Sequence, residues 1–175
     1  MFIGYEVREM LTPLQQKRAW ENMLSAEIRA NYFADLSSRY RWHQRLANWI
    51  TLVLSSGAFI SLVLKMLKDG QESFSWLGWL PALFTLASAA VSAYSIVAQN
   101  YDRAMSGTDL HSRWNRLSKD YQSLWDDIYD EKALDRLQRL EEIGTELSKA
   151  GVAFPNRKRQ MLKWQKHVEQ HHATA

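Results

Sequence analysis

Two rows of polar side chains, spaced as on one face of a helix, lie inside the apolar parts of this sequence. They are its best candidates for functional residues. The apolar stretch at residues 76–98 and the residue after it carry one such row within about 80° of a helix face: Thr85, Ser88, Ser92, Ser95 and Gln99. A second row, in residues 46–64, consists of Asn48, Thr51 and Ser55. Such groups either line a water-filled path between several copies or hydrogen-bond neighbouring helices together. Both interpretations stay open at this point.

The titratable residues offer no recognisable catalytic motif. The chain has no cysteine, which excludes disulfides, thiolate catalysis and cysteine-based zinc sites. His167 and His171 are four residues apart and His172 follows, but no acidic residue stands at the spacing of a zinc protease. The sequence also lacks a glycine-rich phosphate loop and a nucleophile elbow. We therefore predict that the protein is not an enzyme, needs no cofactor and holds no metal.

Two apolar stretches without a charged side chain must position the polar rows. They are Leu46–Leu64 and Trp76–Val97, and each is close to the ~20 residues that a helix needs to cross ~30 Å of hydrocarbon. A core helix of a soluble domain would normally show a polar face. The sequence thus predicts an all-α protein with a transmembrane helical hairpin, whose spans cover about 46–65 and 76–98.

The charges beside these stretches predict the orientation of the hairpin. Arginines cluster before the first span and after the second, whereas the lysines of the connecting loop are offset by acidic residues. This bias places both termini in the cytoplasm. The basic residues expected to contact lipid headgroups are Arg41, Arg45, Lys65 and Arg103.

The segments outside the hairpin read as long amphipathic helices. Thr12-Pro13-Leu14-Gln15 has the pattern of a capping box, from which a single helix can run to Leu64. After the second span, a 4-3-4-3-4 spacing typical of coiled coils predicts oligomer or bundle contacts at Leu110, Trp114, Leu117, Tyr121, Leu124 and Ile128. The rhythm slips at residues 130–132 and resumes at Ala133.

These patterns predict four parts in chain order. Residues 1–45 form an N-terminal cytosolic amphipathic helix, residues 46–98 the hairpin, residues 99–150 a C-terminal cytosolic helix that makes a bundle or coiled coil, and residues 151–175 a basic tail. We interpret the tail as solvated, with anionic lipid headgroups as the alternative partner. Nucleic acid is not expected, because no recognisable binding module interleaves aromatic and basic residues.

This order of parts resembles the SLATT family of bacterial two-helix membrane effectors. The resemblance covers roughly residues 15–150 and rests on the amphipathic N-terminal helix, the basic and aromatic approach Arg39-Tyr40-Arg41-Trp42-His43-Gln44-Arg45, the short-looped hairpin and the long C-terminal helix. It implies a multi-pass protein of the bacterial inner membrane that acts in antiphage defence or conflict. It also implies a trigger from a separate sensor protein or a nucleotide second messenger.

Two functions are compatible with these features. One is a homo-oligomeric effector that permeabilises the membrane on a cytosolic signal, and the other is a non-catalytic anchor or scaffold that recruits a partner through its cytosolic helices. The polar row in the second span favours the effector, because an anchor gains little from aligned hydroxyl groups.

Overall fold

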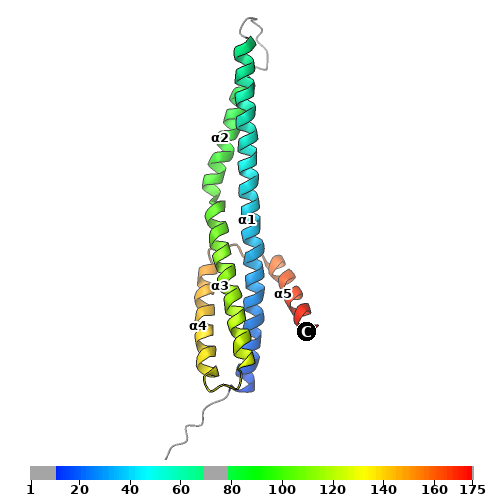
Figure 1. The fold of residues 1–175 in the computed structure, drawn as a ribbon, viewed down its shortest axis with the longest axis vertical. Helices are drawn as coiled ribbons and strands as arrows, with labels where there is room; N and C mark the ends of the chain where they lie inside the picture. The colour runs from blue at the N-terminus through cyan, green and yellow to red at the C-terminus, as the bar shows by residue number, and fades with distance from the viewer. Residues whose placement is uncertain (1–10, 69–78, 175) are drawn as a thin grey trace, which may run out of the picture. The chain divides into compact units, whose positions relative to one another are not determined.

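The computed structural model describes residues 11–68 and 79–174, without the side chains of residues 61–68, 80, 81 and 96–98. The fold is all-α over these residues, as the sequence predicts (Figure 1). The helices are α1 (Pro13–Lys68), α2 (Leu80–Ala98), α3 (Asn100–Asp126), α4 (Ala133–Gly151) and α5 (Lys158–Ala173).

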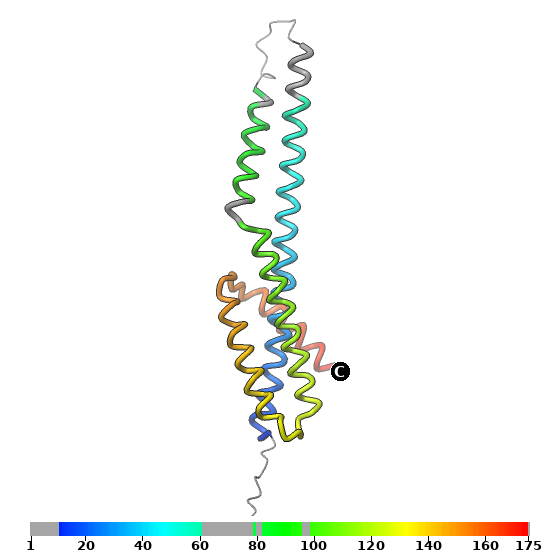
Figure 2. Tube along the Cα trace, turned by 60° about the vertical axis from the view of Figure 1, so that its left-hand side comes forward, coloured from blue at the N-terminus to red at the C-terminus, as the bar shows by residue number. Residues whose placement is uncertain are grey.

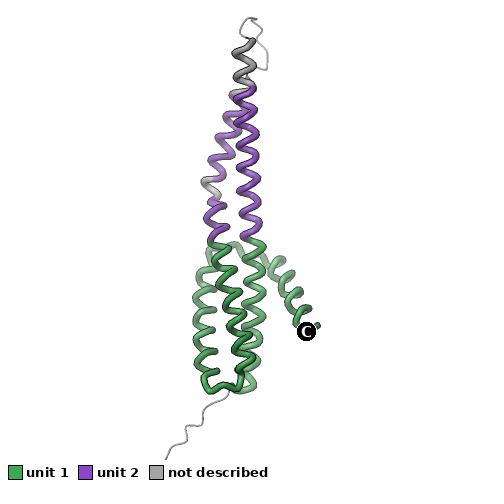
Figure 3. Tube along the Cα trace, in the orientation of Figure 1, with its two compact units in different colours: residues 1–36, 106–175 green, residues 37–105 purple. Residues whose placement is uncertain are grey.

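The chain divides into two compact units (Figure 3). The first, which we call the bundle, comprises residues 1–36 and 106–175, and the second, which we call the hairpin, comprises residues 37–105. Both α1 and α3 contribute residues to each unit.

The predicted capping box starts α1. The Gln15 side chain accepts a hydrogen bond from the Thr12 backbone N–H at 2.8 Å, and Thr12 Oγ1 lies 3.4 Å from the Gln15 backbone nitrogen. Pro13 is the first helical residue, where its missing N–H costs nothing. The helix then runs for 56 residues. The prediction of one continuous helix from Pro13 to Leu64 is therefore confirmed.

The bundle core forms where small residues of α1 meet large residues of α3 and α4. Ala19, Ala26 and Ala30 of α1 are almost fully buried, which lets the neighbouring helices approach closely. All six residues of the predicted row are also buried, five in α3 and Ile128 in the turn after it, together with Leu137, Leu140 and Leu147 of α4. One chain thus covers the row that we expected to serve either an oligomer or a bundle.

The single C-terminal helix predicted over 99–150 is wrong, because the chain turns between α3 and α4. The turn is closed by hydrogen bonds from the Asp130 N–H to the Asp127 carbonyl at 2.9 Å and from the Ala133 N–H to the Asp130 carbonyl at 3.0 Å. Arg136 also pairs with Asp127 at 3.0 Å. Figures 1 and 2 show α4 running back beside α3. The slip in the apolar rhythm marks this reversal, which returns Leu137 to the same core.

The interpretation of residues 151–175 as a solvated tail is also wrong for the described residues. Lys158–Ala173 form α5, which packs against α1 within the bundle (Figure 2). The Gln160 side-chain amide donates to Asp35, and the Tyr32 hydroxyl donates to the Pro155 carbonyl. Val168 is fully buried.

The hairpin is held by small contacts between α1 and α2. Ser55 and Ser88 are hydrogen-bonded at 3.1 Å. A Cβ added at Gly57 would touch the Phe84 ring at 3.7 Å, so the helices are close there. Gln99 separates α2 from α3 with a positive φ of 47°, a left-handed conformation that an L-residue adopts at some energetic cost.

The buried α3 row predicts that a cavity there destabilises the single chain. Leu124→Ala removes a side chain with no exposure, and we expect it to lower the free energy of unfolding by about 2–5 kcal/mol. The measurement is urea unfolding of the detergent-solubilised protein, followed by circular dichroism. Leu162→Ala is the matched control, since Leu162 is 55% exposed in α5. Equal losses in the two variants would contradict this core.

Candidate functional site

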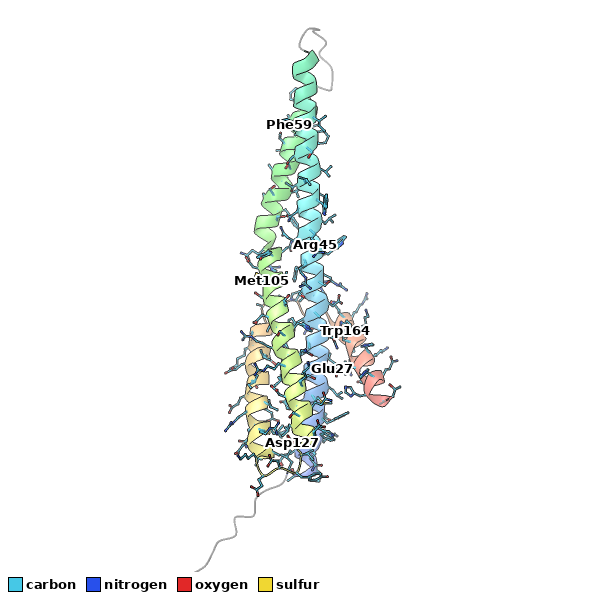
Figure 4. All side chains as sticks on the ribbon, viewed as in Figure 1. Glu27, Arg45, Phe59, Met105, Asp127 and Trp164 are labelled. Atoms are coloured by element: carbon cyan, nitrogen blue, oxygen red, sulfur yellow. The ribbon has the colours of Figure 1, made fainter. Side chains whose placement is uncertain are left out.

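Large apolar side chains cover the outside of the hairpin. Phe59 and Met105, labelled in Figure 4, are 68% and 59% exposed. The others are Trp42, Leu46, Trp49, Ile50, Leu52, Val53, Ile60, Trp79, Leu83, Leu86, Tyr94 and Tyr101. The buried residues of this unit are small or polar, among them Ala47, Ala58 and Ala104. Most of the large apolar side chains described in this unit are therefore exposed on its surface.

Water is a poor solvent for such a surface. Each large apolar side chain removed from water contributes about 1.5–3 kcal/mol, and contiguous apolar patches mark interaction sites for membranes or proteins. Within the described residues, one helical stretch, Ala82–Asp126, is long and apolar enough to cross a membrane, and none of its most apolar window is buried. It contains most of the second predicted span. The outer part of the first predicted span, residues 61–65, has side chains outside the described set.

The polar rows divide between the interior and the surface of the hairpin. Ser88, Ser92 and Ser95 of α2 are half-buried, as is Thr51 of α1. The exposed members of the two rows are Asn48, Ser55, Thr85 and Gln99.

Four residues of the two rows have hydrogen-bond partners, which lower the cost of placing a polar group in an apolar environment. Ser55 and Ser88 satisfy one another across the helices, at 3.1 Å. The Thr85 hydroxyl donates to the Ala82 carbonyl at 2.9 Å, and Asn48 accepts a bond from Gln44 at 3.0 Å. Of the predicted set, the structure therefore brings together Ser55 and Ser88.

The predicted headgroup residues lie on the surface of the hairpin where they are described. Arg41, Arg45 and Arg103 are exposed, and Figure 4 labels Arg45. The Lys65 side chain lies outside the described residues.

The bundle contains an open pocket of about 440 Å³ between α1, α3 and α4. Its wall is polar on the α1 side, from Arg18 to Arg29, and aromatic on the α3 side, at Trp114 and Tyr121. Glu141 of α4 pairs with Arg18 at 3.4 Å. The volume falls in the range of small-molecule sites.

Arg29 gives this pocket an unusual electrostatic character. Its guanidinium lies 4.7 Å from the centre of the Trp114 ring and donates to the Ser148 hydroxyl. Burial lowers the pKa of Arg29 below its ordinary value. No carboxylate within the described residues forms a salt bridge with it. A half-buried cation without a carboxylate partner is suited to an anion.

Tyr121 faces the same pocket in a different electrostatic setting. Burial, and then the negative charge of Glu141, raise the pKa of Tyr121 to about 12 against the opposing effect of its hydrogen bond with Asn22. The neutral phenol is therefore the form that the bundle stabilises.

Two contacts in the bundle escaped sequence reasoning. His111 of α3 lies with Nδ1 2.9 Å from the Ala30 carbonyl oxygen. A carbonyl only accepts, so Nδ1 carries the proton and joins α3 to α1. His172 of α5 lies 2.8 Å from Glu27 of α1. Neither partner is recognisable from spacing, because 81 and 145 residues separate the pairs.

Comparison of the chain with protein-family models, curated proteins and solved structures finds no match.

The raised pKa of Tyr121 predicts how the bundle responds to alkaline pH. In the unfolded chain the phenol ionises near pH 10, whereas in the folded chain it ionises near 12. Folding stability is thus retained below pH 10 and is lost as the pH rises from about 10 towards 12. Tyr121→Phe should lose less stability over this interval than the original chain. Unfolding curves at several pH values test this, and parallel pH profiles for the two proteins would contradict it.

Proposed function

We propose that the hairpin crosses a lipid bilayer twice, with the bundle and both termini in the cytoplasm of a bacterial cell. The exposed apolar surface of the hairpin is the observation that carries this proposal, because hydrocarbon is the solvent that suits it. Arg41, Arg45 and Arg103 then contact headgroups at the cytoplasmic face. Within each span, the hydrogen bonds of the helix itself pair the backbone N–H and C=O groups, which lipid cannot do.

Within this arrangement, the protein acts as a membrane effector that assembles from several copies and permeabilises the inner membrane. Assembly uses the hairpin, because the apolar row of α3 is already buried inside each chain. The half-buried hydroxyls of Ser92 and Ser95 supply polar groups for a path between copies. The resemblance to SLATT effectors supports the same role, in antiphage defence or conflict.

The trigger reaches the bundle from a separate sensor protein or as a diffusible nucleotide second messenger. The pocket beside Arg29 supports a diffusible anion, because its cation has no carboxylate partner among the described residues. The Trp114 ring, already contacted by Arg29, gives the same pocket a flat aromatic surface.

A second candidate function, a non-catalytic membrane anchor, is favoured by one contact. The hydrogen bond between Ser55 and Ser88 uses hydroxyls of both rows to join helices within one chain. In an anchor all of these hydroxyls serve packing, and the bundle recruits a partner.

Expression of the full chain in bacteria, with membrane potential and dye uptake followed, separates the two functions. The effector should collapse the potential, whereas an anchor should leave it unchanged. Ser92→Leu with Ser95→Leu adds bulk and removes both hydroxyls, so we expect permeabilisation to be lost while the protein stays in the membrane fraction. The matched control is Ala89→Leu with Ala93→Leu, at exposed positions of the same helix, where permeabilisation should persist.

Single cysteine substitutions measure the water access of each position directly, even if the leucine variants fail to assemble. The chain has no native cysteine, so a water-soluble thiol reagent reports only the introduced residue. Labelling at 92 and 95 should be faster than at 89 and 93 once the membrane has been depolarised. Equal rates at the four positions, with an intact potential, would leave the anchor as the function.

A further inference from the structure

The C-terminal end of α5 brings two imidazoles to a carboxylate of α1. His172 Nε2 lies 2.8 Å from Glu27 Oε2, and His171 completes a group whose donor atoms all lie within 4.8 Å of one another. Figure 4 labels Glu27 on α1, in the part of the helix that α5 packs against. The cluster lies entirely within the bundle.

The rest of the bundle fixes two of the three side chains. His172 and Glu27 are only 23% and 31% exposed. The Trp20 ring meets the His172 ring edge-on at 5.4 Å between centroids. The fully buried Val168, one turn earlier, holds α5 in place. These contacts position one nitrogen and one oxygen before any ion arrives, which lowers the entropic cost of binding.

His171 is exposed and supplies the adjustable third donor. Zinc binds imidazole nitrogen at about 2.0–2.1 Å and carboxylate oxygen at about 2.0–2.2 Å, so its tetrahedral ligands stand roughly 3.3 Å apart. The spread of up to 4.8 Å therefore has to shrink by about 1.5 Å. Rotation of an exposed side chain achieves this without moving the backbone.

We propose that Glu27, His171 and His172 form a binding site for a divalent transition metal, with Zn²⁺ as the best-suited ion. Two imidazoles and one carboxylate match its preferred ligands, and water completes the fourth position. Binding at His172 Nε2 replaces the hydrogen bond to Glu27 with two metal–ligand bonds. The site joins residues 145 positions apart, so the ion clips α5 onto α1. By linkage, zinc stabilises the docked helix by an amount that rises with the logarithm of the free zinc concentration once this exceeds the dissociation constant.

The test uses the full-length detergent-solubilised chain, prepared without a histidine tag. Zinc is titrated in competition with a chromophoric chelator, and one equivalent should bind to each chain. Cobalt in place of zinc should give the visible absorption of a four-coordinate site. A stoichiometry well below one, or cobalt absorption typical of six-coordinate aqueous ion, would overturn the proposal.

Variants separate a metal site from a merely structural ion pair. His171→Ala is the decisive one, because this exposed side chain makes no hydrogen bond within the described residues and its loss should leave α5 docked. We expect the zinc dissociation constant to rise roughly tenfold or more, with unchanged amide-exchange protection of α5 in the absence of zinc. His167→Ala, one turn away on the same helix, is the matched control and should bind as the original chain does. Equal affinities for these two variants would show that His171 is not a ligand.

Glu27→Gln tests the carboxylate separately. The amide preserves a hydrogen-bonding group for His172 but is a far weaker zinc ligand, so zinc affinity should fall. Added zinc should also stop slowing amide exchange in α5. If zinc still protected α5 in this variant, the carboxylate would be excluded as a ligand and the proposed site with it.

Discussion

The close approach of α1 to its neighbours is the contact on which the bundle depends. Ala19, Ala26 and Ala30 leave room on α1 for the bulkier side chains of α3 and α4, and each is at most 2% exposed. The His111 bond to the Ala30 carbonyl requires the same proximity. A larger residue at any of these alanines would push the helices apart. Overpacking of this kind destabilises a folded protein by about 1–3 kcal/mol. The Arg29 pocket lies beside this face, between α1, α3 and α4.

The hairpin obeys a different constraint. Its helices also meet through small residues, and many of the large apolar side chains described in this unit stay exposed. Two packed helices bury too little apolar area to be stable alone in water. Hydrocarbon removes this difficulty, because lipid tails solvate leucine and phenylalanine as well as a protein core does. The contrast between a bundle with a buried core and a hairpin with exposed apolar side chains is the main physical reason for the proposal that the hairpin lies in lipid.

Much of the fold could be predicted from the sequence, because its determinants are local. The capping box at Thr12 and Gln15 predicts the start of α1, and the spacing of the α3 row predicts the buried face. The turn at 127–132 was harder, since it contains neither proline nor glycine and shows only as a slip in the apolar rhythm. The same slip is compatible with an irregularity inside one long helix, which is why the sequence predicts one helix where the structure has α3 and α4.

The candidate sites depend on partners that no local pattern encodes. The buried face of α1 mixes alanines with large residues such as Met23 and Leu36. Docking of α5 rests on Asp35 and Tyr32, more than a hundred residues away. Glu27 is one of many glutamates in the sequence, and only the folded chain distinguishes it by placing it beside His172. Long-range pairs of this kind need tertiary structure, because sequence periodicity describes one helix at a time.

The hydroxyl contacts of the hairpin are weak enough for one chain to form them alone and to exchange them in an assembly. A side-chain hydrogen bond between membrane helices averages only about 0.6 kcal/mol. The bond between Ser55 and Ser88 is thus close to thermal energy and is a weak latch. Hydroxyls that face α1 in one chain can exchange this partner for water or for a neighbouring copy at little cost. A leucine seam would offer tighter apolar packing but no alternative partner. Weak, exchangeable polar contacts are therefore compatible with a hairpin that rearranges when copies associate.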